Sequence, residues 1–247
     1  MHKIIVLWAV PRSTSTAFEW MMRQRGDLDC LHEPFGEAWY QGEDPLWPRF
    51  QDGDKTTPGL TLDSVWTDIQ ARARAGPVFL KDFPHYVNHL WTPDFLAQMT
   101  HAFLIRDPAK TISSLYAKWP DFDETEVGFP EQRALFDLLW ALHGSPPPVI
   151  DSDDLLEAPE AMVSAFCGAV GIPFLPDALS WEPGGNPDAH SWWDGGSFHH
   201  NLANSTGLKA QPRRYVEVAD APIRVQRVHR RMKPHYTHLY AHRLTPG

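Results

Sequence analysis

The stretch IIVLWAVPRSTSTAFEW, from Ile4 to Trp20, decides the fold of this chain. Ile4 to Ala9 is an apolar run rich in β-branched side chains, which predicts a strand buried on both faces. Hydroxyl groups and one arginine then interrupt the run, and from Thr16 onward apolar side chains recur at helical spacing. The stretch therefore predicts a strand, a hydroxyl-rich turn and a helix.

The predicted turn suits an anion. A helix start presents unpaired backbone N–H groups and the positive end of the helix dipole. Arg12 adds a fixed charge, and further donors come from four hydroxyls: Ser13, Thr14, Ser15 and Thr16. The alternative is that these hydroxyls only cap the helix. Four hydroxyls beside an arginine favour a site for a phosphate or sulfuryl group, although the stretch lacks the glycine pair and lysine of the G-x-x-x-x-G-K-[ST] loop.

The length and charge of the chain limit its class. Its 247 residues allow one sizeable α/β domain, and because no low-complexity linker divides them we expect a single domain over 1–247. The formal net charge of −9 argues against a nucleic-acid partner, which would require a basic face. An anionic ligand would have to be held by local basic residues.

Cysteine usage and hydropathy predict a soluble, cytoplasmic protein. Cys30 and Cys167 both lie in apolar stretches and are expected to be buried free thiols, which fits a reducing compartment. The N-terminal apolar run stops at Pro11-Arg12, too early for a secretory signal. No run is long enough to span a membrane, so we expect no membrane partner.

Strands and helices are expected to alternate along the chain. The expected strands begin at Ile4, Asp29, Val78, His101 and Val149, and the expected helices include 62–73, 108–118, 131–143, 159–170 and 223–242. Two long irregular segments are expected at 36–59 and 181–211. The alternation predicts an α/β fold of three layers, αβα, around a central parallel sheet with a P-loop-like turn after the first strand.

Four of the expected strands end in polar side chains. These are Arg12-Ser13-Thr14, His32-Glu33, Lys81-Asp82 and Arg106-Asp107. Because the carboxyl ends of parallel strands meet at one edge of a sheet, we expect these groups to converge. We also expect the second strand to lie beside the first, and His32 to point away from Glu33 because side chains alternate along a strand.

Two stretches together resemble the sulfotransferases that use 3′-phosphoadenosine 5′-phosphosulfate (PAPS). Pro11 to Thr16 is similar to the first motif of that family, with the arginine of its carbohydrate and bacterial branch and with Thr14 in place of a common glycine. FLIRDPAKTISSLY is similar to the second motif, an Arg-x-Pro with a serine eight residues after the arginine, here Arg106 and Ser114. A third stretch, 150–160 with 171–174, is similar to a late strand, turn and helix of the family.

The resemblance implies transfer of a sulfuryl group from PAPS to a hydroxyl of a small-molecule or sugar acceptor, with 3′-phosphoadenosine 5′-phosphate (PAP) as product. Arg106 and Ser114 would hold the 3′-phosphate of the donor. In-line transfer needs positioning and stabilised charge rather than a metal, and Arg12 with the turn suits that task. Lys81 could reach the same charge, or it could form a salt bridge within the edge.

An acceptor hydroxyl also needs a general base, for which Glu33 and His85 are the candidates. The stretch HEPF, from His32 to Phe35, resembles the carbohydrate-type enzymes, which implies that Glu33 takes the acceptor proton. The alternative for Glu33 is an ion pair with Arg12 or Lys81. In the lid-like segment before the C-terminal helix, further donor contacts are expected from Ser205, Thr206, Gly207 and Lys209.

Two other classes of function remain open. One is a kinase-like nucleotide enzyme, against which the missing lysine and glycines of the turn weigh. The other is a non-catalytic relative, against which the joint presence of Arg12, Glu33, Arg106 and Ser114 weighs. The histidines of the C-terminal helix could line one face, but a solvated helix is favoured over a zinc site.

Overall fold

Five strands form the centre of the fold. In the computed structural model, which describes residues 1–47, 55–184, 205–210 and 216–245, they are β1 (Ile4–Trp8), β2 (Asp29–His32), β3 (Val78–Asp82), β4 (Thr100–Ile105) and β5 (Val149–Asp151). They pair in the order β2-β3-β1-β4-β5, and every pair is parallel. The parallel sheet predicted from the sequence is confirmed.

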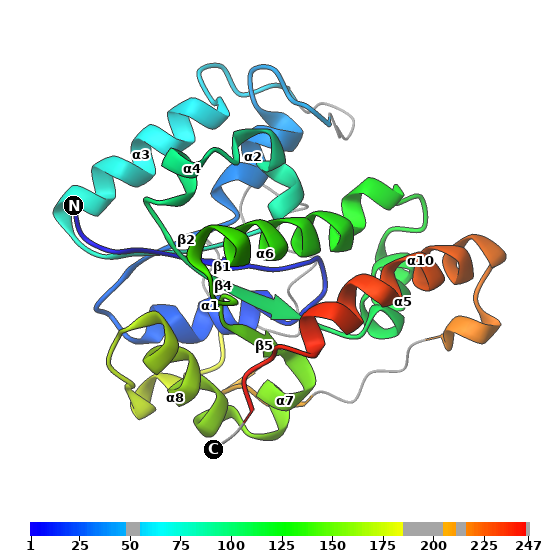
Figure 1. Cartoon of the computed structure of the whole chain (residues 1–247). Coiled ribbons are helices and arrows are strands. Elements are labelled where there is room, and N and C mark those ends of the chain that lie inside the picture. The colour runs from blue at the N-terminus through cyan, green and yellow to red at the C-terminus, as the bar shows by residue number, and fades with distance from the viewer. Residues whose placement is uncertain (48–54, 185–204, 211–215, 246–247) are drawn as a thin grey trace.

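Helices cover both faces of this sheet. They are α1 (Ser15–Gln24), α2 (Pro34–Gln41), α3 (Leu62–Ala75), α4 (Pro93–Leu96), α5 (Pro108–Lys118), α6 (Phe129–His143), α7 (Ser152–Glu157), α8 (Pro159–Val170) and α10 (Ile223–Tyr240). In Figure 1, α1, α7 and α8 lie below the sheet, whereas α2, α3 and α6 lie above it. Every residue of β1 and β3 is buried, as expected for central strands covered on both faces. The three-layer αβα architecture is confirmed.

The position of β2 differs from the prediction. We expected the second strand beside the first, but β3 lies between β2 and β1. The apolar residues Val78, Phe79 and Leu80 suit a fully buried position, whereas β2 is short and begins with the exposed Asp29, which is typical of an edge strand. Glu33 therefore follows a strand that lies roughly 10 Å from β1.

The segment after β2 also differs from the prediction. Instead of an irregular excursion from Gly36, the chain forms helix α2 over Pro34–Gln41. Pro34 occupies the first turn, where a proline is compatible with the helix, and Phe35, Ala38 and Trp39 recur at helical spacing and are buried. The glycine and aromatic residues favoured a loop in the prediction. The structure forms a helix because the apolar side chains of this segment lie on one buried face.

The C-terminal part of the chain completes the fold. Helix α10 packs beside α5 and α6 (Figure 1). The segment that follows α10 returns to β5, where the Leu244 N–H donates to the Val149 carbonyl at 2.8 Å and Arg243 forms a parallel bridge with Val149. Cys30 and Cys167 are buried and not disulfide-bonded, as predicted.

None of the helices in the described ranges has both the length and the apolar character that crossing a membrane requires.

Candidate active site

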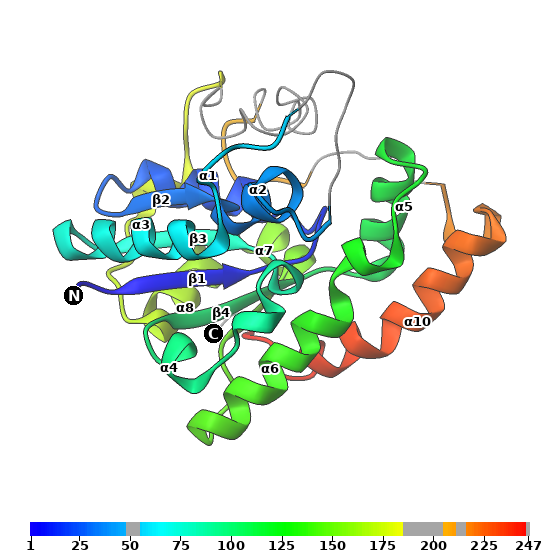
Figure 2. The ribbon, with the colours of Figure 1, turned by 90° about the horizontal axis from the view of Figure 1, so that it is seen from above.

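The carboxyl ends of four strands meet at one edge of the sheet, as the sequence predicted. Figure 2 shows β1 to β4 running in the same direction. The register places Lys81 opposite Leu7 of β1 on one side and His32 of β2 on the other. Lys81 therefore lies between the ends of β1 and β2. We call this edge of the sheet, which carries Arg12, Glu33, Lys81 and Arg106, the polar edge.

The turn between β1 and α1 has an unusual backbone. Arg12 and Thr14 adopt left-handed conformations, with φ of 66° and 74°. Between them Ser13 is fully buried, and its hydroxyl donates to the Val10 carbonyl at 2.6 Å. The hydroxyl of Ser152, at the start of α7, donates to the Ser13 carbonyl. Thr14 precedes α1 without a side-chain capping bond, so capping does not explain its hydroxyl.

Two arginines and a serine join the first and second motifs. The Arg12 Nε donates to the Ser114 hydroxyl at 3.1 Å, and the Arg106 Nη1 donates to the Arg12 carbonyl at 2.9 Å. Arg106 and Ser114 are both 5% exposed, so Ser114 lies on the inner face of α5 rather than on its surface. Hydrogen bonds therefore link the segments that follow β1 and β4 with α5, and they bring two arginines and a hydroxyl into one connected cluster, a set of donors that suits a phosphate.

Glu33 and Lys81 form an ion pair at the neighbouring strand ends. The Lys81 ammonium, which is fully buried, donates to Glu33 Oε1. The backbone of Glu33 is left-handed, with φ of 42°, and it immediately precedes α2. This ion pair is one of the alternatives stated for both residues, and it places a carboxylate and an ammonium side by side at the polar edge.

His32 lies on the same side as Glu33, so the prediction that the two side chains diverge is wrong. The His32 Nε2 is 3.8 Å from Glu33 Oε1, and its Nδ1 bonds to Oε2 of Glu19 in α1. Side chains alternate only while the backbone stays extended. The left-handed turn at Glu33 ends the alternation and brings its carboxylate back over the His32 ring.

Two buried carboxyl groups support this edge. Burial alone would raise the pKa of Glu19, but His32, Lys81 and Arg23 outweigh it and hold the pKa at about 2. Asp82 is fully buried and accepts from the backbone N–H groups of Phe35 and Phe83, at 2.9 and 2.8 Å. Burial raises the pKa of Asp82 well above its usual range. Asp82 thus ties the end of β3 to the start of α2.

His85, the rival base, lies in an aromatic cluster. It is 3% exposed, and its ring centroid is 4.4 Å from that of Tyr86 and 5.3 Å from that of Trp39. Neither ring nitrogen bonds to a described residue, and a Cβ added to Gly128 would lie 2.5 Å from its Nδ1. Burial lowers the pKa of His85 to about 3. His85 is thus enclosed by aromatic rings, whereas the Glu33 side chain is 13% exposed at the strand ends.

The expected lid falls largely outside the described residues, since 185–204 are not described. Its described end is anchored at Trp181, whose Nε1 donates to the Ser205 hydroxyl at 3.1 Å and whose N–H donates to the Thr206 carbonyl at 3.3 Å. Gly207 bridges Ser180 with antiparallel pairing. Contact of Ser205, Thr206, Gly207 or Lys209 with a donor stays a prediction.

Helix α10 bonds to residues at the ends of β4 and β5, contacts that the sequence did not indicate. The Lys233 ammonium is 2.9 Å from Asp107, whose other oxygen accepts from the Ala109 N–H at the start of α5. The Tyr236 hydroxyl donates to Asp151 at 3.0 Å. Lys233 and Asp107 are separated by 126 positions, so no local spacing could have paired them.

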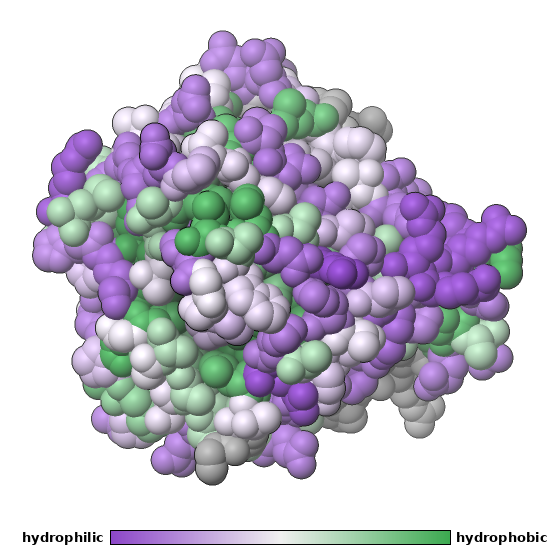
Figure 3. Space-filling model, viewed as in Figure 1, coloured by the Kyte–Doolittle hydropathy of each residue, from purple (hydrophilic) through white to green (hydrophobic). Residues whose placement is uncertain are grey.

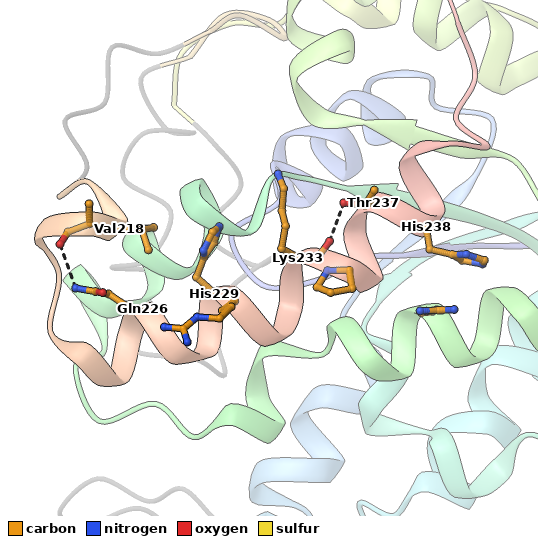
Figure 4. Close-up of a pocket in the computed structure, with 10 residues that line it drawn as sticks. Val218, Gln226, His229, Lys233, Thr237 and His238 are labelled. Carbon is orange, nitrogen blue, oxygen red and sulfur yellow. Dashed lines mark hydrogen bonds between the residues drawn. The ribbon is translucent and has the colours of Figure 1, made fainter.

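The outer side of α10 is hydrophilic (Figure 3) and borders a groove of about 870 Å³. Figure 4 shows His229 and Lys233 extending from α10 beside it, with Val218 and Gln226 at one end and His238 at the other. The predicted site residues do not line this groove, although its lining residue Lys233 pairs with Asp107 at the end of β4. Within the described parts of the chain, no three His, Cys, Asp or Glu side chains are grouped to hold a metal ion.

Comparison with known families agrees with this geometry. The family model described as "Sulfotransferase domain" matches residues 2–225, which contain all five strands and the strand-end residues above. The chain belongs to this sulfotransferase domain family. Helix α10, which begins at Ile223, lies almost wholly beyond the matched part of this sulfotransferase domain.

Two curated relatives of this sulfotransferase domain come from Arabidopsis thaliana. "Branched-chain-amino-acid aminotransferase-like protein 2" is 27% identical over 223 residues, which cover 86% of this chain and 37% of that protein. "Branched-chain-amino-acid aminotransferase-like protein 1" is 25% identical over 223 residues, which cover 86% of this chain and 38% of that protein. The chain thus spans well under half the length of these relatives.

Two solved structures share the fold. The sulfotransferase domain from the curacin biosynthetic pathway has a TM-score of 0.52 and 15% identity, covering 94% of this chain and 98% of that one. The sulfotransferase domain from the Synechococcus PCC 7002 olefin synthase has a TM-score of 0.56 and 16% identity, covering 93% of this chain and 94% of that one. At these identities the likeness establishes the sulfotransferase fold.

Proposed function

We propose that this chain is a sulfotransferase that moves a sulfuryl group from PAPS to a hydroxyl of a small-molecule or sugar acceptor. The observation that carries the proposal is the cluster of Arg12, Arg106 and Ser114, in which the Arg12 guanidinium donates to the Ser114 hydroxyl and Arg106 donates to the Arg12 backbone carbonyl. The family match supports transfer of a sulfuryl group in general. The donor, the acceptor class and the roles of the residues belong to the proposal.

The residues divide into a donor side and an acceptor side. Arg106 and Ser114 would bind the 3′-phosphate, while Arg12 and the first turn of α1 stabilise charge on the transferring and leaving oxygens. Lys81 of β3, the strand between β2 and β1, contacts Glu33 and would contribute to both the donor side and the acceptor side. Glu33 would accept the proton of the acceptor hydroxyl, because its carboxylate lies at the polar edge with its side chain 13% exposed.

A kinase-like enzyme and a non-catalytic relative remain as alternatives. A kinase would need a magnesium site and a lysine in the phosphate turn, whereas this turn carries Arg12 and hydroxyls. A non-catalytic relative would not need Glu33 in a left-handed conformation beside a buried lysine. Melting temperatures with PAP, with ATP and Mg²⁺, and in buffer separate the three, since a ligand stabilises the folded state that binds it.

The substitution Arg106→Ala tests the donor site. Binding of PAP should weaken roughly tenfold to a hundredfold, because a charge-assisted hydrogen bond of about 1.5–3 kcal/mol is lost. Binding of adenosine 5′-phosphate, which lacks the 3′-phosphate, should change little. Titration calorimetry with both nucleotides measures the difference, and Arg133→Ala, in an exposed pair with Asp137, is the control.

If Arg106→Ala weakened the binding of both nucleotides equally, Arg106 would not be the residue that binds the 3′-phosphate. Transfer of label from radiolabelled PAPS to a panel of phenols, alcohols and sugars then tests the reaction itself. A protein that binds PAP but transfers nothing to any acceptor or to water would be a non-catalytic relative.

A further inference from the structure

His32 is a neighbour of Glu33 to which the proposed reaction gives no role. Its Nε2 is 3.8 Å from Glu33 Oε1, the same oxygen that Lys81 contacts. The His32 side chain is only 7% exposed, so it is held within the edge rather than in solvent. Both contacts fall on Oε1.

Glu19 determines where the His32 ring points. Its Oε2 bonds to His32 Nδ1, and its Oε1 accepts from Arg23 at 2.8 Å, one turn further along α1. Glu19 is 1% exposed, and a buried carboxylate without partners would be costly. The His32 ring is therefore clamped at Nδ1, which directs the opposite nitrogen towards Glu33.

We propose that His32 is a positioning residue for Glu33, and that Glu19 holds it in place. This inference rests on the proposed function, in which the acceptor O–H bond breaks and its proton moves to Oε2 of Glu33. The acceptor oxygen bonds to sulfur while the bond from sulfur to the 5′-phosphate oxygen of PAPS breaks, and PAP leaves with that oxygen. Lys81 bonds to Oε1 and the His32 ring packs beside it, and together they keep Oε2 aimed at that proton. Lys81 would also face the charge of the donor, whereas the contacts of His32 with Glu19 and Glu33 are both to carboxylates.

Two substitutions of His32 separate this role from a structural one. An asparagine places its amide near Nδ1, so His32→Asn keeps a donor for Glu19 and loses the contact with Glu33. A glutamine reaches further, so His32→Gln keeps a group near Glu33. The substitution His238→Asn, in the exposed pair between His238 and Asp137 at 2.7 Å, is the matched control.

The measurement is PAP release from PAPS, which records transfer to an added phenol or to water, with Glu33→Gln as the reference. We expect His32→Asn to lower kcat about tenfold to a hundredfold, because a small misplacement of a reacting group has an effect of that order. The KM for PAPS and the melting temperature should stay near those of the unmodified protein. His32→Gln should recover most of kcat, and His238→Asn should match the unmodified protein.

The outcomes distinguish the inference from the function on which it rests. Normal kcat in His32→Asn, together with loss in Glu33→Gln, overturns the positioning role and leaves the sulfotransferase proposal standing. Equal losses in both His32 variants that follow their melting temperatures overturn it in favour of a structural role. Normal turnover in Glu33→Gln overturns the assignment of Glu33 as base, and the role of His32 with it.

Discussion

Three non-glycine residues of the described chain adopt left-handed backbone conformations, and all three lie at the polar edge: Arg12, Thr14 and Glu33. Each such conformation costs about 1–2 kcal/mol for a residue with a Cβ. Strain of this kind persists where the surrounding structure over-determines it, which is common at functional sites. Here it turns the chain sharply after β1 and after β2.

The position of Thr14 allows a direct test of this strain. Thr14→Gly should stabilise the protein by up to about 1 kcal/mol, because glycine adopts a positive φ without steric cost and this outweighs its larger entropy in the unfolded chain. Thr16→Gly, two residues along in α1, should instead destabilise by up to about 1 kcal/mol. Urea unfolding measures both, and a destabilised Thr14→Gly would contradict the strain.

The low pKa of Glu19 predicts an acid-dependent contribution to stability. A folded-state pKa of about 2 lies below the unfolded value of about 4.3, so ionised Glu19 stabilises the fold above that value and the contribution disappears as pH falls through about 2. Its size is on the order of 3 kcal/mol. The difference in unfolding free energy between the unmodified protein and Glu19→Gln should therefore shrink between about pH 4 and about pH 2.

The comparison of the two proteins removes the contributions of other buried acids to the pH dependence, because both proteins contain them. Asp82 and Asp151, whose pKa values burial raises, are examples. A difference that stays constant over this range would show that the charge of Glu19 does not stabilise the fold.

The residues of the polar edge could be predicted because charged and hydroxyl side chains directly follow the apolar runs that form the strands. Arg12, Lys81 and Arg106 each follow such a run, so their placement at strand ends could be predicted without the order of the strands. Glu19 could not be identified in this way, because an acid in a helix is usually exposed. Its only signal is its position beside Phe18 and three residues before Met22, on the buried face of α1.

At the scale of elements, α10 and the junction of β5 and α7 support the turn between β1 and α1. Tyr236 of α10 bonds to Asp151, which caps α7 through its other oxygen, and the next residue, Ser152, bonds to the Ser13 carbonyl. A short series of hydrogen bonds thus runs from the C-terminal helix to the turn after β1. This link explains how an element almost wholly outside the family match can stabilise the site.

Removal of one hydroxyl tests that link. Tyr236→Phe should destabilise the protein by about 1–3 kcal/mol, because Asp151 is 1% exposed and would lose a hydrogen-bond donor to a buried oxygen. Tyr240→Phe, one turn along and half-buried, should stay within about 0.5 kcal/mol, since within the described ranges its hydroxyl makes no hydrogen bond. Urea unfolding compares the two, and equal effects would contradict the role of Tyr236.

Element types were easier to predict than element order. Buried strands and long amphipathic helices are encoded locally, so β1, β4, α5, α8 and α10 could be predicted from apolar runs, prolines and spacing. The insertion of β3 between β2 and β1 is decided by which strand can be buried on both faces, a competition between distant segments. Helix α2 was missed because its glycine and proline are loop signals unless tertiary packing buries the apolar stripe.

At the scale of the whole molecule, charge is distributed unevenly. The chain has a formal net charge of −9, yet buried or half-buried cations line the polar edge: Arg12, Lys81 and Arg106. Local cations can hold an anion against an unfavourable overall field if they are close and partly shielded from solvent.

The segment after α10 has a consequence for self-association. An outer strand of a sheet presents unpaired N–H and C=O groups, a template on which a second chain can add its own strand. The bond from Leu244 to Val149 and the bridge from Arg243 occupy that template along β5. A chain shortened before Arg243 would keep all five strands but expose the edge of β5. We expect such a chain to aggregate through this edge while it is still folded.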